Sequence, residues 1–150
     1  AETQMQVIAS HPDYNLWQGR FSPDGKWISF NAYKATDGAV STIYVVPATG
    51  GDWIPISEGK FWDDKPRWSP DGKTIYFVSN RTGFFNVWKV PFDPTVGKPL
   101  DQPTRVTNFE SSTQMIMPNI VPMEMVLTRD QLILPMIDTT GGIWILENID

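Results

Sequence analysis

One repeated segment constrains the fold of this chain more than any other feature. Residues 21–26 read Phe-Ser-Pro-Asp-Gly-Lys, and residues 68–73 read Trp-Ser-Pro-Asp-Gly-Lys, so five identical residues recur at a spacing of 47. Ser, Pro, Asp and Gly follow one another in the order that a type I turn prefers. Each copy is therefore predicted to be a tight turn between antiparallel strands. The residues given this structural role are Ser22, Pro23, Asp24, Gly25, Ser69, Pro70, Asp71 and Gly72.

Each turn is followed by runs that are typical of β-strands. Apolar residues alternate along 28–32 in the first copy and along 75–79 in the second, which indicates one buried face. Two further strands are predicted in each copy. They span residues 43–46 and 53–57 in the first copy, and 87–90 and 105–107 in the second. The proline within 53–57 favours a strand at the sheet edge, where a missing N–H costs no ladder bond.

A weaker third copy is predicted once its turn is allowed to shrink. Residues 126–131 stand where the turn stood, residues 132–136 alternate, and residues 143–146 supply the next strand. This copy has no fourth strand. At the other end, residues 7–10 lie 47 positions before 54–57 and are interpreted as an outer strand without a blade.

A period of about 45 residues with four strands per unit indicates β-propeller blades. We predict an all-β chain in which residues 1–150 form one propeller segment of about three four-stranded antiparallel blades. The blades span about 17–57, 65–108 and 121–147, and strand 5–10 completes a blade in trans or belongs to a preceding blade. Three blades would leave open edges that invite pairing. Two hypotheses follow: a homodimer closes a six-bladed ring, or the chain is part of a longer propeller.

The second copy also carries a family resemblance. Residues 66–83, from Pro-Arg-Trp-Ser-Pro-Asp-Gly-Lys to Ser-Asn-Arg-Thr-Gly, resemble the TolB-like, WD40-like propeller repeat. Residues 138–146 are similar to the C-terminal blade of bacterial proteins that join such propellers to kinase or regulatory domains. The resemblance weakens at 109–125 and at 130–131. It implies a periplasmic or secreted bacterial platform that binds proteins, peptides or small ligands, and TolB-like repeats also accompany peptidases and form a metal-dependent lyase site.

Charge and composition limit the classes of partner that this chain is expected to bind. The net charge is −5 and the basic residues are scattered, so nucleic acid is not expected to bind. No apolar run approaches the ~20 residues that span a bilayer, so no membrane span is predicted. The chain has no cysteine, which excludes disulfides and thiolate metal sites.

The sequence offers little catalytic chemistry. His11 is the single histidine, which excludes a metal site built on several imidazoles, and the chain has no Gly-x-Ser-x-Gly elbow. We therefore predict no catalytic residue, no metal and no cofactor, and we interpret the protein as a non-enzymatic binding or scaffold module for a protein or a small ligand. The alternatives are a fragment of a bacterial sensor or regulator, and a fragment of a propeller-containing hydrolase.

Aromatic and charged residues gather where the innermost strands are predicted to begin. Such mixtures are favoured at binding surfaces, although large aromatics also wedge blades together. The predicted contact residues are Trp17, Arg20, Trp62, Asp63, Asp64, Lys65 and Arg67. The adjacent acids at 63 and 64 could hold Ca²⁺ or a cationic ligand, but two carboxylates are few for that ion, and a capping or solvated loop role is favoured.

Two other segments have unusual composition. Five of the six methionines fall between 115 and 136, which suits either an adaptable partner surface or the filling of an irregular core, and we favour the second. Residues 91–103 contain four prolines and one glycine and are predicted to be a long loop between two strands.

Overall fold

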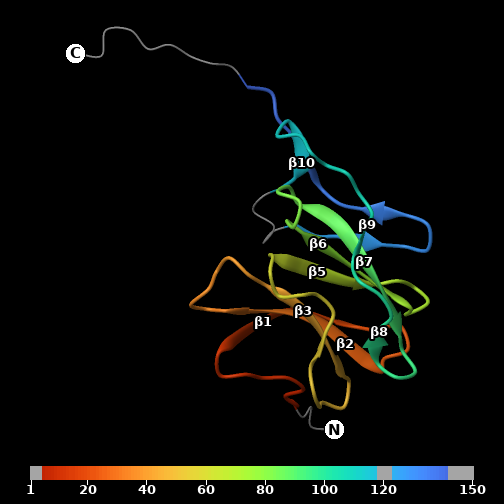
Figure 1. The fold of residues 1–150 in the computed structure, drawn as a ribbon. Helices are drawn as coiled ribbons and strands as arrows, with labels where there is room; N and C mark the ends of the chain where they lie inside the picture. The colour runs from red at the N-terminus through yellow and green to blue at the C-terminus, as the bar shows by residue number, and fades with distance from the viewer. Residues whose placement is uncertain (1–4, 118–122, 142–150) are drawn as a thin grey trace.

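The computed structural model describes residues 5–117 and 123–141, and every regular element in those ranges is a β-strand. Two antiparallel sheets and two short strand pairs follow one another along the molecule (Figure 1). The first sheet contains β1 (Tyr14–Phe21), β2 (Trp27–Lys34), β3 (Thr42–Pro47) and β4 (Ile54–Pro55). The second contains β5 (Asp63–Trp68), β6 (Thr74–Ser79) and β7 (Asn86–Asp93), with β8 (Lys98–Pro99) and β9 (Thr104–Arg105) both paired to β7.

The repeated segments form the turns that join β1 to β2 and β5 to β6. In the first, the Ser22 hydroxyl donates to Asp24 Oδ1 at 2.7 Å, and Gly25 has a φ of 72°. In the second, the Ser69 hydroxyl donates to Asp71 Oδ1 at 2.6 Å. The same hydroxyls accept backbone N–H groups from the start of the next strand, so each serine closes its own turn.

The third repeat is less regular than the first two. Its described strands are β10 (Gln114–Ile116), β11 (Val126–Leu127), β12 (Leu132–Ile133) and β13 (Met136–Asp138), paired as β10 with β13 and β11 with β12. The shortened turn is present, because Thr128 Oγ1 accepts the Gln131 N–H at 3.1 Å. The expected four-stranded third blade is replaced in the described ranges by these two pairs, and the predicted strand 143–146 lies outside them.

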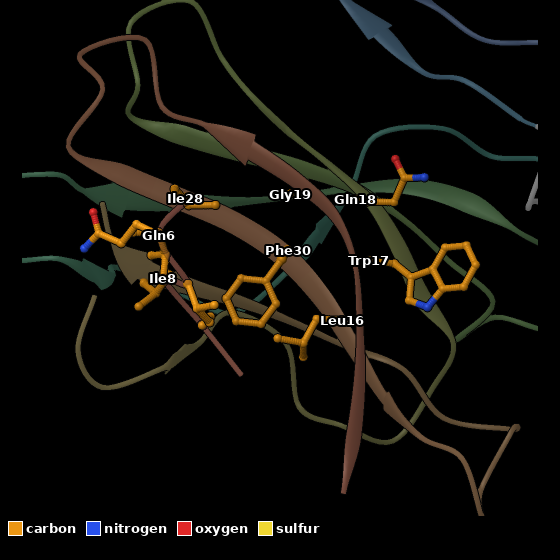
Figure 2. A pocket seen from close by; sticks show the side chains of 11 residues that line it. Gln6, Ile8, Leu16, Trp17, Gln18, Gly19, Ile28 and Phe30 are labelled. Atoms are coloured by element: carbon orange, nitrogen blue, oxygen red, sulfur yellow. The ribbon is translucent and has the colours of Figure 1, made fainter. Parts of the chain in front are cut away.

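Both inner strands carry a β-bulge at the same place in the repeat. The pairing register shifts between Trp17 and Arg20 in β1, and between Asp64 and Arg67 in β5. Gln18 and Lys65, 47 residues apart, have φ values of 58° and 56° there. The bulge places Trp17 and Gln18 on one side of the β1 ribbon and Leu16 on the other (Figure 2). Gly19 and Pro66 were the available sequence signal, since these residue types inside a strand mark bulges.

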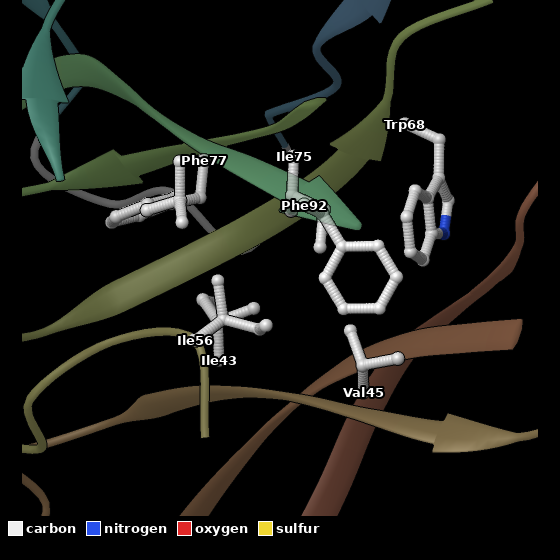
Figure 3. Packing of buried hydrophobic residues seen from close by; sticks show 8 residues of the cluster. Ile43, Val45, Ile56, Trp68, Ile75, Phe77 and Phe92 are labelled. Carbon is white, nitrogen blue, oxygen red and sulfur yellow. The ribbon is translucent and has the colours of Figure 1, made fainter. Parts of the chain in front are cut away.

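The main core lies between the two sheets. Ile43, Val45 and Ile56 of the first sheet face the second sheet (Figure 3). The second sheet contributes Trp68, Ile75, Phe77, Val90 and Phe92. Burying such side chains contributes about 1.5–3 kcal/mol each, so this layer is the principal contact between the blades.

The methionines fill the next layer. Met123 and Met125 are fully buried against Val78 and Val87 of the second sheet, together with Ile116. The described strands on either side, β10 and β11, are only three and two residues long. The flexible methionine side chain suits packing beside such short strands.

The outer face of the first sheet is only partly covered. Phe30 lies there in a cluster with Ile8 and Ala9 of the N-terminal segment. Phe77 of the second sheet packs against Ile56 at the interface between the two sheets. Phe77 and Ile56 lie 47 residues after Phe30 and Ala9, so the two contacts are equivalent in the repeat. The N-terminal segment therefore holds the position of an outer strand. Residues 5–11 have no strand structure in the single chain, and no strand within the described ranges pairs with them. The prediction that 5–10 completes a blade in trans, or belongs to a preceding blade, stays a prediction.

The proline-rich stretch 91–103 is more ordered than the long loop that the sequence predicts. Strand β7 continues to Asp93 and turns back into β8, and Gly97 has a φ of 69° in the turn. The tip of this hairpin docks on the first sheet, since Trp27 Nε1 donates to the Pro94 carbonyl at 3.1 Å. The hairpin adds a second contact between the sheets.

Candidate functional site

The predicted contact residues lie on the two bulged inner strands, but they separate into three groups. Four of the seven line one cavity of about 120 Å³ between the sheets, namely Trp17, Trp62, Asp64 and Lys65. Gln18, Asn31 and Tyr33 complete its lining and were not predicted. Arg20 and Arg67 meet the third repeat, and Asp63 faces the core between the sheets.

Aromatic rings form the walls of this cavity. Tyr33 and Trp62 have ring centroids 5.6 Å apart, and Trp17 is 51% exposed at the entrance. The Asp64 carboxylate accepts the Lys65 backbone N–H at 2.6 Å. Burial raises the pKa of Asp64, and this hydrogen bond and the nearby charge of Lys65 oppose the rise.

Two buried oxygen atoms in the cavity lining have no hydrogen-bond partner within residues 5–117 and 123–141. Asn31 is 2% exposed, and its Nδ2 donates to Ser41 Oγ at 3.1 Å while its Oδ1 is unpaired. The second atom is Oε1 of Gln18. Leaving a buried acceptor unsatisfied costs about 1–3 kcal/mol, so such atoms are uncommon in folded proteins. They are the feature that sequence reasoning missed, because only tertiary contacts show which amides lack partners.

Arg20 and Arg67 hold the third repeat against the inner strands. Arg67 Nη2 lies 2.5 Å from Glu124 Oε2, and Arg67 Nε donates to the Met125 carbonyl at 2.7 Å. Arg20 Nη2 lies 3.7 Å from the same Glu124 oxygen. Burial lowers the pKa of Arg67, and the charge of Arg20 adds to that effect. These arginines have a packing role in this arrangement.

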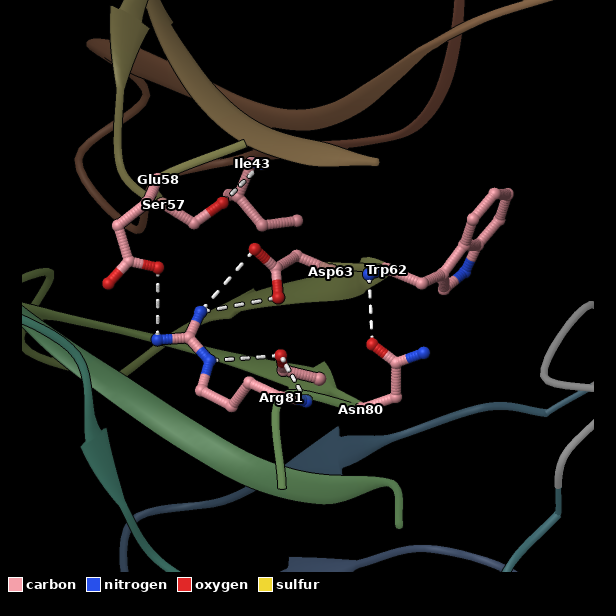
Figure 4. Close-up of polar contacts among 8 residues, drawn as sticks. Ile43, Ser57, Glu58, Trp62, Asp63, Asn80 and Arg81 are labelled. Carbon is pink, nitrogen blue, oxygen red and sulfur yellow. Dashed lines mark hydrogen bonds and ion pairs between the residues drawn. The ribbon is translucent and has the colours of Figure 1, made fainter. Parts of the chain in front are cut away.

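Asp63 belongs to a buried network around Arg81 (Figure 4). Arg81 Nη2 lies 3.3 Å from Asp63 Oδ1, its Nη1 lies 3.3 Å from Glu58 Oε2, and its Nε donates to Ser79 Oγ at 3.0 Å. Burial raises the pKa of Asp63, while hydrogen bonds from Ser79 and Ser57 and the charge of Arg81 oppose this. Arg81 also stacks over Trp88 at 4.7 Å.

The adjacent acids therefore do not form a shared cation site. Successive strand residues point to opposite faces, so Asp63 enters the Arg81 network while Asp64 lines the cavity. The favoured sequence interpretation, a capping or solvated loop, is also wrong, because both acids are buried in β5. Residues 5–117 and 123–141 contain no group of three or more His, Cys, Asp or Glu side chains that could hold a metal ion.

His11 lies in an exposed loop. Its Nδ1 accepts the Asp13 N–H at 3.1 Å, and its ring packs edge-on to Tyr14 at 4.8 Å. The geometry makes His11 part of an aromatic cluster with Trp53, 5.7 Å away.

A larger cavity, about 420 Å³, lies on the outer face of the first sheet (Figure 2). Its lining is mainly apolar and includes Ile8, Leu16, Ile28, Phe30 and Val46. This is the face that a neighbouring blade covers in the second sheet. Trp17 and Gln18 line both cavities, so the two cavities meet at the bulge of β1.

Comparison with known sequences places peptidases among the relatives. An uncharacterized protein of Agrobacterium fabrum is 40% identical over 82 residues, which is 55% of this chain and 26% of that protein. The uncharacterized peptidase YuxL of Bacillus subtilis is 31% identical over 67 residues, 43% of this chain and 10% of YuxL. Dipeptidyl-peptidase 5 of Porphyromonas gingivalis is 38% identical over 79 residues, 45% of this chain and 12% of the peptidase. No family model matches the sequence.

These relatives correct one prediction. The expectation that the protein is not an enzyme is wrong, because two of the curated relatives are named as peptidases. That expectation depended on the chemistry within 150 residues, whereas the chain spans only about a tenth to a quarter of the relatives' lengths. The repeat indicates how the sheets pack and carries no information about peptidase activity.

The fold comparison agrees with the strand arrangement. A solved structure from Agrobacterium tumefaciens, provisionally assigned as TolB, superimposes with a TM-score of 0.57 at 22% identity and covers 88% of this chain and 48% of that one. No helix within the described ranges is long and apolar enough to cross a membrane. The all-β antiparallel sheets and this likeness agree with the resemblance seen in the repeats, and the chain has a TolB-like β-propeller fold.

Proposed function

We propose that this chain is the propeller portion of a larger peptidase-type protein, in which the cavity between the first two sheets contacts the peptide substrate. The observation that carries this proposal is the match of its sequence to two proteins named as peptidases. The matched stretches are 67 and 79 residues long, which is more than one repeat.

The chemistry of the chain supports a substrate-binding role for this portion. A Ser-His-Asp hydrolase needs a histidine beside its nucleophile. His11 is the single histidine, and its Nδ1 accepts a hydrogen bond from the backbone N–H of Asp13. The bond-breaking groups of the proposed peptidase would therefore come from another part of the protein, and this segment would bind and position the peptide.

The cavity suits that role because it combines rings with hydrogen-bond acceptors. Trp17 is exposed at the entrance, and Trp62 and Tyr33 are half-buried. Aromatic anchors beside a few fixed polar groups are common at peptide-binding and protein-binding sites.

A second candidate function is a protein-interaction platform within a bacterial regulator. The TolB-like fold suggests an interaction module. The mainly apolar outer face of the first sheet favours a protein partner, since large exposed apolar surfaces usually mark contacts. This candidate predicts binding without peptide hydrolysis by the protein of which this chain would be a part.

The test is peptide hydrolysis by the complete polypeptide in which this sequence occurs. We expect cleavage of fluorogenic peptides, and we expect Trp17→Ala in that protein to lower kcat/KM about tenfold, the size of a modest aromatic contact. Phe21→Ala is the matched control, because Phe21 is 66% exposed on the same strand and does not line the cavity. A pure full-length protein that cleaves no peptide would contradict the proposal and favour the interaction platform.

A further inference from the structure

We propose that the cavity between β1, β2 and β5 binds the guanidinium group of an arginine side chain in a peptide ligand. The peptide nature of the ligand rests on the proposed function, whereas the guanidinium group is inferred from the cavity itself. The inference depends on unpaired acceptors, aromatic walls and the size of the space.

The cavity lining contains two hydrogen-bond acceptors that can receive N–H groups from a ligand. Oδ1 of Asn31 and Oε1 of Gln18 both belong to residues that line the cavity, and neither has a hydrogen-bond partner among the residues that the structure describes. Asn31 is 98% buried, so its unpaired oxygen is not compensated by bulk solvent. A ligand that donates N–H groups would remove this cost, and guanidinium carries five N–H donors in one plane.

The aromatic side chains around the cavity favour a planar cation over other N–H donors. Three aromatic residues, Trp17, Tyr33 and Trp62, line the cavity. A guanidinium stacks on aromatic faces and is weakly hydrated, and Trp is the best ring partner for a cation. Asp64 adds a carboxylate to the cavity lining, and the positive charge of Lys65 balances it. The preference of the cavity for a guanidinium group therefore depends on the aromatic rings and the hydrogen-bond acceptors rather than on net charge.

The volume limits what can enter. At about 120 Å³ the cavity exceeds the space that one water molecule needs, and it admits a group of only a few heavy atoms. The tip of one side chain therefore fits, while the rest of a peptide would lie outside, against the exposed Trp17.

Backbone strain also concentrates at this cavity. Gln18 and Lys65 are the two non-glycine residues with positive φ in the described ranges, and both line it. Such conformations cost of order 1–3 kcal/mol and cluster at ligand sites. The bulges thereby bring Gln18 to the same cavity as Asn31.

The second repeat suggests a substitution that tests the role of Asn31. Val78 stands 47 residues after Asn31, at the equivalent position of the second sheet, so valine is compatible with this strand position. Asn31→Val removes the unpaired acceptor and retains a good strand residue. Asn15→Val is the control, because Asn15 is exposed on β1 and does not line the cavity.

The experiment is isothermal titration of the 150-residue chain with methylguanidine and with four acetylated pentapeptides that differ only at a central Arg, citrulline, Gln or Ala. We expect the Arg peptide to bind at least tenfold more tightly than the Ala peptide, with citrulline between them. Asn31→Val should remove this preference, while Asn15→Val should keep it, and near-ultraviolet circular dichroism would verify that both variants are folded.

Equal affinities for the four peptides, or an Arg preference that survives Asn31→Val, would overturn the inference. The failures of the two proposals are distinguishable. Peptide cleavage by the full protein without an Arg preference would sink only the guanidinium assignment. Binding of methylguanidine that Asn31→Val removes, without peptide cleavage, would preserve the site and sink the peptidase role.

Discussion

At the scale of single residues, the repeated turns show how a short pattern fixes a local structure. Asp71 Oδ1 accepts the Ser69 hydroxyl and the Lys73 N–H, and these bonds lower the pKa of Asp71 below its ordinary 3.8. The same pair in the first turn, Ser22 and Asp24, lowers the pKa of Asp24 in the same way. All partners lie within a few residues, so this part of the structure could be predicted from sequence.

The lowered pKa predicts the direction of a pH effect. A depressed carboxyl pKa means that the folded chain holds the proton less tightly than the unfolded chain, so the ionised Asp71 stabilises the fold at pH above the unfolded value. That contribution is lost as pH falls from about 4 through the folded-state pKa. We expect Asp71→Asn to lower the free energy of unfolding at neutral pH, with the deficit shrinking below about pH 4.

Urea unfolding of both proteins across this range measures the difference. A deficit that is unchanged down to the lowest pH would show that the Asp71 charge does not contribute. Asp101→Asn is a control in an exposed loop, where Asp101 accepts the N–H of its neighbour Gln102.

At the scale of the elements, the charged residues inside the sheet interface could not be predicted from the repeat. Asp63 and Arg81 form a buried pair between the sheets, whereas the equivalent positions of the first repeat are Leu16 and Lys34. The repeat thus predicts the position of a strand residue but not whether it is apolar or charged. That depends on what the neighbouring sheet places opposite.

We expect Asp63→Leu alone to destabilise the protein by about 3–5 kcal/mol, because it leaves the buried Arg81 without this partner. The double variant Asp63→Leu with Arg81→Met should cost less than the sum of the two single variants. Urea unfolding of all four proteins measures the coupling. Additive costs would show that the pair is not coupled.

The β7–β8 hairpin gives a second prediction at this scale. A Cβ at Gly97 would collide with the Trp27 ring, and the φ of 69° already disfavours other residues. Gly97→Ala should therefore cost about 2–4 kcal/mol, as the sum of backbone strain and overpacking. Gly83→Ala is the matched control: Gly83 has a φ of 91° with open space around its Cβ position, so it should cost only about 1–2 kcal/mol.

Thermal or urea unfolding of the two alanine variants separates strain from collision. Equal losses would show that the Trp27 contact with the hairpin adds nothing. A larger loss at Gly97 would show that the hairpin tip fastens the two sheets together.

At the scale of the whole molecule, the outer face of the first sheet is only partly covered. The N-terminal segment lies where an outer strand would be, and the cavity of about 420 Å³ beside it is lined mainly by apolar residues. The covering strands would come from a second copy or from further blades of a longer polypeptide. For the isolated 150-residue chain we expect self-association through this face.

Light scattering during size-exclusion chromatography measures this directly. We expect twice the 17.0 kDa of one chain, and we expect Leu16→Asp, which copies Asp63 at the equivalent position, to return the mass to 17.0 kDa. A folded wild-type monomer would contradict closure by a second copy. It would leave the longer polypeptide as the source of the covering strands.

The sequence by itself determined the all-β class, the repeated turns and the strands that follow them in the first two repeats, because those features depend on contacts among nearby residues. Which side chains meet at the site depended on the tertiary structure alone. The unpaired oxygen atoms of Gln18 and Asn31, the separation of Asp63 from Asp64, and the packing of Met123 each depend on a bulge or on an opposing sheet. The sequence period fixes which residues share a strand position, whereas the partners across the interface decide which polar groups form hydrogen bonds.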